Sequence, residues 1–558
     1  MSRKTRAANP PATPAQRAEK ILLASHKLHE GGNPQGAIEG YHKVLALLPA
    51  PQDPQGRAVR GDALHLMGLI EITRGRFGTA MDLIGEAINV NPAAHIYYTH
   101  LGTVFFRLGL FDKAEEACRR SVVMNPGFAF SHYNFGNVLA KTGKTEEARA
   151  EYLKSLALNP NDSETITSIG TTYHAQSDFD SAIQWYRRAV EVAPSNHQAH
   201  YNIGVALHDQ ARYEEALPYY ERALAVKPGY VLPLWNRGLT RLTLGNLKEG
   251  WDDFEARWQF EEQMREVSIP AKRFRRPMWR GEKGAPLRIH LHGEQGVGDT
   301  LQFCRYAEMV RAMGHDVRLE VPPPLLDLLR RSLTRDGISV QSMAPDYPGG
   351  MGILEFDYHC PMMSLPRAFG TEVATIPWNG PYLKPDPEKV AKWQARLAGY
   401  PGRKIGLCWA GGKRTHDPLL AAVDGRRSVS ADTLKPIWSR PGDTYVSLQV
   451  GTNAVGEGHT ILDWTKEIDS FDDTAALIEA LDLVISVDTS VIHVAGGLGK
   501  PIWMLNRYDT CWRWLRSGSE TKWYPSMKII RQPRAKDWRS VVEEVVRMLG
   551  DATVGVAA

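Results

Sequence analysis

The chain has 558 residues, of which 43% are hydrophobic and 23% charged, and its formal net charge is +4. This length exceeds what one hydrophobic core supports, so we expect several domains. The small net charge does not indicate a nucleic-acid partner. The sequence has no apolar run of about 18 residues, so we expect no membrane span. The five cysteines are scattered without a CxxC pair, which predicts no metal site and is typical of a reducing, cytoplasmic compartment.

Residues 1–17 lack the apolar stretch of a secretory signal, and we expect them to form a flexible tail. Residues 18–264 carry three residue types that recur every 34 residues. The glycines are Gly68, Gly102, Gly136, Gly170, Gly204 and Gly238. The alanines are Ala80, Ala114, Ala148, Ala182 and Ala216, and the prolines are Pro92, Pro126, Pro160, Pro194 and Pro228. This pattern is that of the tetratricopeptide repeat (TPR), which predicts an α-solenoid, the TPR superhelix.

Each repeat is expected to form two packed helices. The glycine and the alanine allow the helices to approach closely, and an aromatic side chain such as Tyr152 or Tyr186 fills the remaining gap. The proline ends the second helix because it has no amide proton and clashes with the preceding turn. TPR arrays bind other proteins, so we expect a protein partner.

Asparagines occupy one position on the first helix of three repeats: Asn134, Asn202 and Asn236. An asparagine side chain offers donors and an acceptor to a peptide backbone, so these residues are candidates for binding an extended acceptor segment. The alternative is that they make hydrogen bonds between helices. In this feature the array resembles that of O-GlcNAc transferase, which has asparagine in the same place.

Residues 265–285 are basic and aperiodic and are expected to be a linker. Short apolar runs then alternate with helical stretches, which predicts parallel sheets covered by helices. We expect one lobe of alternating strands and helices over 286–385, a connection over 386–402, and a second lobe over 403–549 that ends in a C-terminal helix. Residues 550–558 are expected to form a tail. We therefore expect two Rossmann-like lobes facing a cleft, with ligands at the carboxyl ends of the strands.

A glycine turn containing Gly296 and Gly298 follows the first expected strand and ends in Asp299 at the start of a helix. Glycines let the backbone turn tightly and approach a ligand closely. The spacing is neither a dinucleotide fingerprint nor a P-loop. Asp299 is either a helix cap or a general base at the mouth of the cleft.

In the second lobe, Asp488, Thr489 and Ser490 follow an apolar strand and open a helix that contains His493. Free amides and the helix dipole at such a position suit a diphosphate. The alternative is an ordinary capped helix in which His493 makes a polar contact in the core.

A third motif combines a glycine turn at Gly411 with the cations Lys413 and Arg427. These cations are able to neutralise a leaving phosphate. The alternative, a solvated basic loop, is equally compatible with the sequence.

These three motifs, in this order and each at a strand end, resemble those of the heptosyltransferase-like glycosyltransferases of family 9 over roughly 287–549. The resemblance implies a GT-B fold, no metal or other cofactor, Asp299 as the general base, and a donor phosphate held by Asp488, Thr489, Ser490 and His493. Ser490 departs from the glycine or alanine that is usual there, and the loop around Lys413 and Arg427 matches only loosely.

The layout of repeats followed by such a domain is similar to that of bacterial TPR-fused transferases, some of which glycosylate flagellin. We therefore expect a cytoplasmic, inverting glycosyltransferase that moves a sugar from a nucleotide-sugar to a protein acceptor bound by the TPR superhelix, with flagellin as one candidate acceptor. The alternatives are a TPR scaffold with an inactive transferase fold, and a transferase acting on lipid or polysaccharide.

Overall fold

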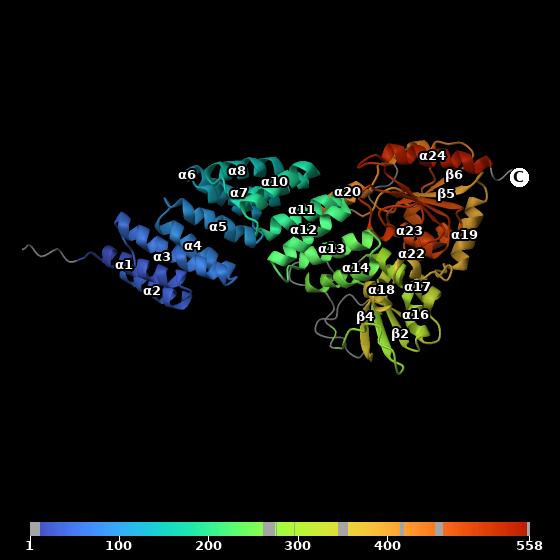
Figure 1. The fold of residues 1–558 in the computed structure, drawn as a ribbon, viewed down its shortest axis with the longest axis horizontal. Helices are drawn as coiled ribbons and strands as arrows, with labels where there is room; N and C mark the ends of the chain where they lie inside the picture. Colours follow the sequence, from blue (N-terminus) through green and yellow to red (C-terminus); the bar gives the residue numbers. More distant parts are fainter. Residues whose placement is uncertain are drawn as a thin grey trace, which may run out of the picture. The chain divides into compact units, whose positions relative to one another are not determined.

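The computed structural model describes residues 12–260, 274, 276–294, 296–343, 355–412, 418–451 and 461–554 (Figure 1). The internal contacts divide the chain into two compact units, Met1–Ala199 and His200–Ala558. Each unit is described separately below. No helix within the described ranges is long and apolar enough to cross a bilayer.

Unit 1 consists of helices that pack in consecutive antiparallel pairs. They are α1 (Pro14–Glu30), α2 (Pro34–Leu47), α3 (Pro54–Thr73), α4 (Phe77–Val90), α5 (His95–Arg107), α6 (Phe111–Met124), α7 (Ala129–Lys141), α8 (Thr145–Leu158), α9 (Ser163–Ala175) and α10 (Phe179–Val192). The predicted TPR solenoid is therefore confirmed.

The periodic residues have the packing roles that the sequence predicts. A Cβ atom added to Gly136 would lie 2.5 Å from the Tyr152 ring, and one added to Gly170 would lie 2.6 Å from the Tyr186 ring. The second helix of each repeat ends two residues before its proline, as α8 does at Leu158 before Pro160. The repeat pattern is thus a contact pattern between paired helices.

Helix α1 begins at Pro14, before residue 18, where we expected the array to start. The Thr13 hydroxyl accepts a hydrogen bond from the Gln16 backbone N–H, and the Thr13 backbone N–H donates to Gln16 Oε1, which is a capping box. Pro14 has the fixed φ that suits a first helical position. These local signals extend the helix into the segment expected as a tail.

Unit 2 begins with the remaining repeat helices: α11, which starts at His197 in unit 1 and continues to Asp209, α12 (Tyr213–Val226), α13 (Val231–Thr243), α14 (Leu247–Phe254) and the 3₁₀ turn η1 (Glu255–Phe260). Leu242, Leu247, Trp251 and Phe254 lie in the same hydrophobic core as the strands and helices that follow. The Trp251 indole donates to the carbonyl of Thr371 at 2.9 Å. The last repeats are therefore part of the α/β unit.

The first lobe is a four-stranded parallel sheet of order β3-β2-β1-β4. Its strands are β1 (Arg288–His292), β2 (Asp316–Val321), β3 (Ile338–Ser342) and β4 (Tyr358–Pro361). Its helical segments are α15 (Val297–Phe303), α16 (Tyr306–Ala312), η2 (Pro323–Leu325), α17 (Leu326–Leu333), η3 (Met362–Ser364), α18 (Leu365–Ala368) and η4 (Val373–Thr375). Part of the expected linker belongs to this lobe, because Met278 bridges to His359 and Trp279 is buried.

The second lobe is a five-stranded parallel sheet of order β6-β5-β7-β8-β9. Its strands are β5 (Lys404–Cys408), β6 (Thr444–Ser447), β7 (Leu483–Val487), β8 (Ile502–Asn506) and β9 (Met527–Arg531). Its helical segments are α19 (Pro387–Leu397), α20 (Pro418–Arg427), α21 (Ala431–Trp438), η5 (Thr465–Glu467), α22 (Phe471–Glu479), α23 (Ser490–Gly497), η6 (Trp512–Trp514) and α24 (Trp538–Val554). The predicted parallel α/β character is confirmed, and β9 is an additional strand.

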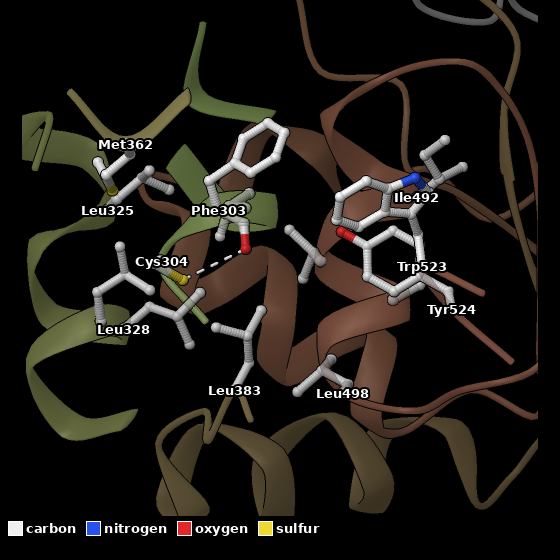
Figure 2. Packing of buried hydrophobic residues seen from close by; sticks show 14 of the residues in the cluster. Phe303, Cys304, Leu325, Leu328, Met362, Leu383, Ile492, Leu498, Trp523 and Tyr524 are labelled. Carbon is white, nitrogen blue, oxygen red and sulfur yellow. Dashed lines mark hydrogen bonds between the residues drawn. The ribbon is translucent and has the colours of Figure 1, made fainter. Parts of the chain in front are cut away.

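The two lobes share one hydrophobic core (Figure 2). Phe303, Cys304 and Leu328 of the first lobe pack in the same cluster as Ile492 and Trp523 of the second. A separate core lies between the second sheet and the helices α21 and α24, and it contains Leu434, Trp438 and Val545. Helix α19, in the segment expected as an inter-lobe connection, contributes Trp393 and Leu397 to the shared core.

Arg305 lies deep in this junction and is only 7% exposed. Its guanidinium donates to the Trp523 carbonyl at 2.8 Å, the Pro377 carbonyl at 3.2 Å and the Tyr382 hydroxyl at 3.0 Å. It also lies within 6 Å of four ring centroids, those of Trp378, Tyr382, Trp523 and Tyr524. Carbonyl oxygens and ring faces therefore replace water around this buried cation.

Candidate active site

The carboxyl edge of the second sheet brings two of the predicted motifs together. The chain leaves β5 for β6 on one side and returns to β7 on the other, so β5 and β7 form the switch point at which open α/β sheets bind ligands. Cys408 ends β5, and its Sγ lies 3.7 Å from the Thr489 hydroxyl, which follows β7. The turn after β5 is fixed by the buried Gln449, whose Oε1 accepts from the backbone N–H groups of Trp409 at 3.1 Å and Ala410 at 2.8 Å.

Arg427 covers the glycine turn. A Cβ atom on Gly411 would lie 2.4 Å from Arg427 Nη2, so the guanidinium in this position packs directly on the glycine backbone. Arg427 pairs with the buried Asp424 at 3.0 Å, and its Nε has no hydrogen-bond partner within the described residues. Lys413 lies outside the described residues.

Helix α23 starts at the expected place. Thr489 is its N-cap residue in an extended conformation and makes no side-chain capping bond. Asp488, Thr489 and Ser490 are half-buried, and the helix behind them is buried. A Cβ atom on Gly496 would lie 2.4 Å from the Tyr524 ring, so the helix sits directly on that side chain. The free backbone N–H groups in the first turn of α23 therefore lie at the boundary between the core and the solvent.

His493 does not reach that edge. It is 5% exposed, and its Nδ1 lies 2.9 Å from the Tyr524 hydroxyl. Burial lowers the pKa of His493 well below its ordinary value, and the nearby cations Arg513 and Arg305 act in the same direction. The histidine is therefore neutral and makes the polar core contact that was the alternative reading of this residue.

Helix α15, which carries Asp299, packs directly against α23. A Cβ atom on Gly298 would lie 2.9 Å from His493 Cδ2 and 3.7 Å from Ser490 Cα. Gly296 is the N-cap residue of α15, so Asp299 lies inside the first turn and is not its cap. The glycine turn of the first lobe thus lies beside the first turn of α23.

Asp299 is engaged in an ion pair. Its Oδ1 accepts a hydrogen bond from Arg513 of η6, and the exposed fractions of the two side chains are 19% and 11%. Burial raises the pKa of the Asp299 carboxyl above its usual value; the Arg513 guanidinium opposes this rise and the Asp488 carboxylate adds to it. Asp299 and Asp488 are therefore close enough to affect each other electrostatically.

A second ion pair fixes the other end of the glycine turn. Arg257 of η1 donates to both carboxylate oxygens of Glu294, at 2.7 and 3.1 Å, and their side chains are 6% and 5% exposed. The Met363 backbone N–H donates to the same carboxylate at 3.0 Å. Burial raises the pKa of Glu294, and Arg257 counteracts this rise. The end of the repeat array therefore holds the turn that leads to Asp299.

The three asparagines have different environments. Asn236 Nδ2 donates to the Tyr201 hydroxyl at 3.0 Å and to the Leu232 carbonyl at 3.1 Å, which is the inter-helix role. Asn134 is 9% exposed, and its Nδ2 has no partner within the described residues. Asn202 is half-buried. The Nδ2 atom of Asn134 is buried and not accessible to a partner, and the acceptor-binding role of Asn134 and Asn202 stays a prediction.

A cavity of about 230 Å³ lies elsewhere in unit 2, between the end of the array and the first lobe. Asp252, Glu255, Trp279, Ser364 and Arg367 are among its lining residues. Asp299 does not line it. Within the described residues, no group of three or more His, Cys, Asp and Glu side chains is arranged to hold a metal ion.

Tetratricopeptide-repeat family models match residues 65–129, 128–195 and 167–231. These residues are tetratricopeptide repeats. Protein FlbA of Caulobacter vibrioides (strain ATCC 19089 / CIP 103742 / CB 15) is 29% identical to the chain over 339 residues. This similarity covers 56% of the chain and 54% of that protein, so the chain spans about half the length of this curated relative.

Among solved structures, a tetratricopeptide repeat protein from Parabacteroides merdae ATCC 43184 is 15% identical, covers 44% of this chain and 95% of its own length, and has a TM-score of 0.38. YrrB, described as a TPR protein with an unusual peptide-binding site, is 20% identical over 35% of this chain and 97% of its own length, with a TM-score of 0.29. At these TM-scores neither structure supports an argument about this chain.

Sequence reasoning did not find Arg513, Glu294, Arg257 or Gln449. Arg513 is 214 residues from its partner Asp299, and no local spacing connects the two. One signal was available: Arg513 follows the apolar run that forms β8, on the same sheet edge as Asp488. The neighbouring aromatic residues Trp512 and Trp514 are buried in the core.

Proposed function

We propose that the chain is a cytoplasmic, metal-independent, inverting glycosyltransferase of the GT-B type. It moves a sugar from a nucleotide-sugar to a hydroxyl of a protein acceptor that the repeats bind, with flagellin as one candidate. The observation that carries the proposal is the packing of α15 on α23, which brings Asp299 to the first turn of a helix at a sheet switch point. All five cysteines are free, which agrees with a reducing compartment.

In the proposed reaction, Asp299 accepts the proton of the acceptor hydroxyl as that oxygen attacks the anomeric carbon of the sugar. The bond between this carbon and the donor phosphate breaks, and the phosphate leaves with the electron pair. The first-turn amides of α23, with Arg427 and Lys413, stabilise the negative charge that develops on it. A carboxyl whose pKa is raised by burial is a better proton acceptor than an exposed one.

The test is Asp299→Asn in the full-length protein. We expect loss of sugar transfer by a factor of about 10² to 10⁴, because the amide accepts no proton, with nucleotide binding retained. Intact-mass measurement of proteins from cells with and without the gene finds the acceptor, and the same measurement with the variant reads out transfer. Asp327→Asn, which changes an exposed aspartate of α17, is the matched control. Sugar transfer by Asp299→Asn at the wild-type rate would refute the role of Asp299 as the general base.

A scaffold without transferase activity is the second candidate. It is favoured by the ion pair between Asp299 and Arg513, which occupies one oxygen of the proposed base, and by the burial of His493. This candidate predicts that the wild-type protein binds none of a panel of nucleoside mono- and diphosphates in calorimetric titrations. A transferase acting on lipid or polysaccharide predicts instead that no protein changes mass.

A further inference from the structure

Arg513 joins the two lobes at the candidate active site. It lies in η6, which follows β8 of the second lobe, and two of its bonds go to α15 of the first lobe. Its Nη2 donates to Asp299, and its Nε donates to Gln302 Oε1 at 2.7 Å. The guanidinium lies 4.3 Å from the centroid of the Trp512 ring, which supports it from its own lobe. Arg513 therefore faces the segment that carries the proposed base.

Two carboxylates act on the charge of Arg513. Asp299 and Asp488 are both near enough to raise the pKa of this guanidinium, although burial alone would lower it. Other cations also act on these carboxylates, Arg257 on Asp299 and Arg507 on Asp488, but Arg513 is the cation that is hydrogen-bonded to Asp299. A phosphate that binds at α23 brings further negative charge to the same place, and the Arg513 guanidinium is the nearby cation for which it would compete with Asp299.

The hydrogen-bonding capacity near Arg513 is also incompletely used. A guanidinium carries five N–H groups, and Arg513 makes three contacts within the described residues, with Asp299, Gln302 and Cys511. The Nε2 of Gln302 is buried and has no partner there. The cluster therefore has donors left for an additional acceptor.

We propose that Arg513 is a shared positioning residue: its guanidinium is paired with Asp299 in the ligand-free protein and is taken over, wholly or in part, by the donor phosphate when that binds at the first turn of α23. This proposal rests on the proposed function. Its consequence is that donor binding removes the counter-ion of Asp299 and leaves the carboxylate a stronger base. The base would therefore become active only when a donor is present.

The experiment is a double-mutant cycle on the full-length protein, with inorganic pyrophosphate as the probe in calorimetric titrations. Asp299→Asn releases the guanidinium, so we expect pyrophosphate to bind about tenfold more tightly, the scale of one charge-assisted hydrogen bond. Arg513→Gln should weaken binding by about tenfold or more. In the double variant the gain from Asp299→Asn should disappear, because the group it releases is absent.

The controls separate this coupling from general electrostatics and from misfolding. Arg516→Gln removes a cation three residues along the same segment, where Arg516 pairs with Glu214 and is 48% exposed, and it should leave the affinity unchanged. Arg513→Lys keeps the charge but loses the planar fork, so its affinity should lie between those of wild type and Arg513→Gln. It replaces Arg513→Gln in the cycle if thermal melting shows that the glutamine variant is not folded.

Two results would overturn the inference. One is a gain from Asp299→Asn that persists in the Arg513→Gln background, which would mean that the two residues act independently. The other is the absence of pyrophosphate binding to both the wild-type protein and Asp299→Asn. If the cycle shows coupling but no sugar transfer is found, the proposed function is refuted and the inference about Arg513 stands. If sugar transfer is found but the two substitutions are additive, the inference is refuted and the proposed function stands.

Discussion

The repeats of unit 1 and the repeats of unit 2 follow one sequence pattern but have different surroundings. In unit 1 the buried residues of a repeat, such as Tyr152 and Ile166, belong to clusters made only of repeat helices. In unit 2, Trp251 and Phe254 lie in a core that extends through both lobes. A solenoid in which each repeat contacts only its neighbours therefore describes unit 1 and not unit 2.

Polar contacts show the same difference. Asp209 of α11 pairs with Arg426 of α20 at 3.3 Å, and Arg426 also pairs with Asp509 at 2.9 Å. The Arg516 backbone N–H donates to the Thr243 carbonyl at 3.0 Å. The last repeats are thus bonded to the segments that flank the candidate active site, and a partner bound to them would act on the same structural unit as the proposed chemistry.

The largest expected effect comes from Arg257→Gln. The substitution leaves the buried carboxylate of Glu294 without its cation, which typically costs about 3–5 kcal/mol. We expect faster hydrogen–deuterium exchange in peptides that cover β1 and α15, with exchange in α3–α8 unchanged. The measurement is exchange followed by mass spectrometry on the full-length chain.

The matched control for that substitution is Arg119→Gln in unit 1. Arg119 is 57% exposed and pairs with Glu115 at 2.9 Å, so its loss should cost less than about 1 kcal/mol. Equal effects of the two substitutions would show that the last repeats are no more firmly joined to the lobes than the first are to one another.

Glycine substitutions provide a smaller test of the repeat packing. Alanine at Gly136 places a Cβ atom 2.5 Å from the Tyr152 ring, and alanine at Gly204 places one 2.6 Å from the Tyr220 ring. Each should cost about 1–3 kcal/mol, because a well-packed interior has no room for the added methyl group. Exchange should rise around α7–α8 for the first variant, and around α11–α12 and η6 for the second.

Gly85→Ala is the control for both glycine variants. A Cβ atom at Gly85 of α4 meets nothing within 4 Å, so alanine should stabilise this helix by roughly 0.5–1 kcal/mol. If the second variant leaves η6 unaffected, the bonds between α11 and the second lobe do not transmit local strain.

The smallest expected effect is the contribution of one buried histidine of unit 1 to the pH dependence of stability. Burial, together with the neighbouring His100, lowers the pKa of His65 to about 3, so the folded form stays neutral where the unfolded form takes up a proton. Stability should therefore fall as the pH drops below about 6.5, by about 1 kcal/mol near pH 5.5. Thermal melting of His65→Gln should show a shallower loss between pH 7 and 5.5, and the same change at His26, whose side chain is 43% exposed, should leave the loss intact. Parallel curves for all three proteins would contradict this account.

The sequence allowed the repeats to be predicted because each glycine and its aromatic partner lie at a fixed separation, as Gly136 and Tyr152 do. Strands such as β7 were predictable because a buried parallel strand is a continuous apolar run. The positions of Asp488, Thr489 and Asp299 at strand ends followed from the same alternation. Strand β9 was missed, because charged residues stand at Lys528 and Arg531 within a short apolar run.

The ion pairs of the site could not be predicted in this way. Arg257 and Glu294 are 37 residues apart. Arg257 lies in η1, after the last repeat helix, and Glu294 lies beside the glycine turn of the first lobe, so no sequence periodicity relates the two. The burial of His493 was also hidden, because it depends on Tyr524 and on the glycine at position 298, which come from other elements. Contacts of this kind depend on how the lobes pack against each other, and no local sequence pattern predicts that packing.

The buried Arg305 has a consequence for how substrates enter. Separating the lobes would remove the Trp523 carbonyl and the rings of Trp523 and Tyr524 from its cation, and would divide a single core. A clamshell motion of that size would resemble partial unfolding more than hinge bending. For the proposed transferase, this predicts that a donor reaches α23 without separation of the two lobes.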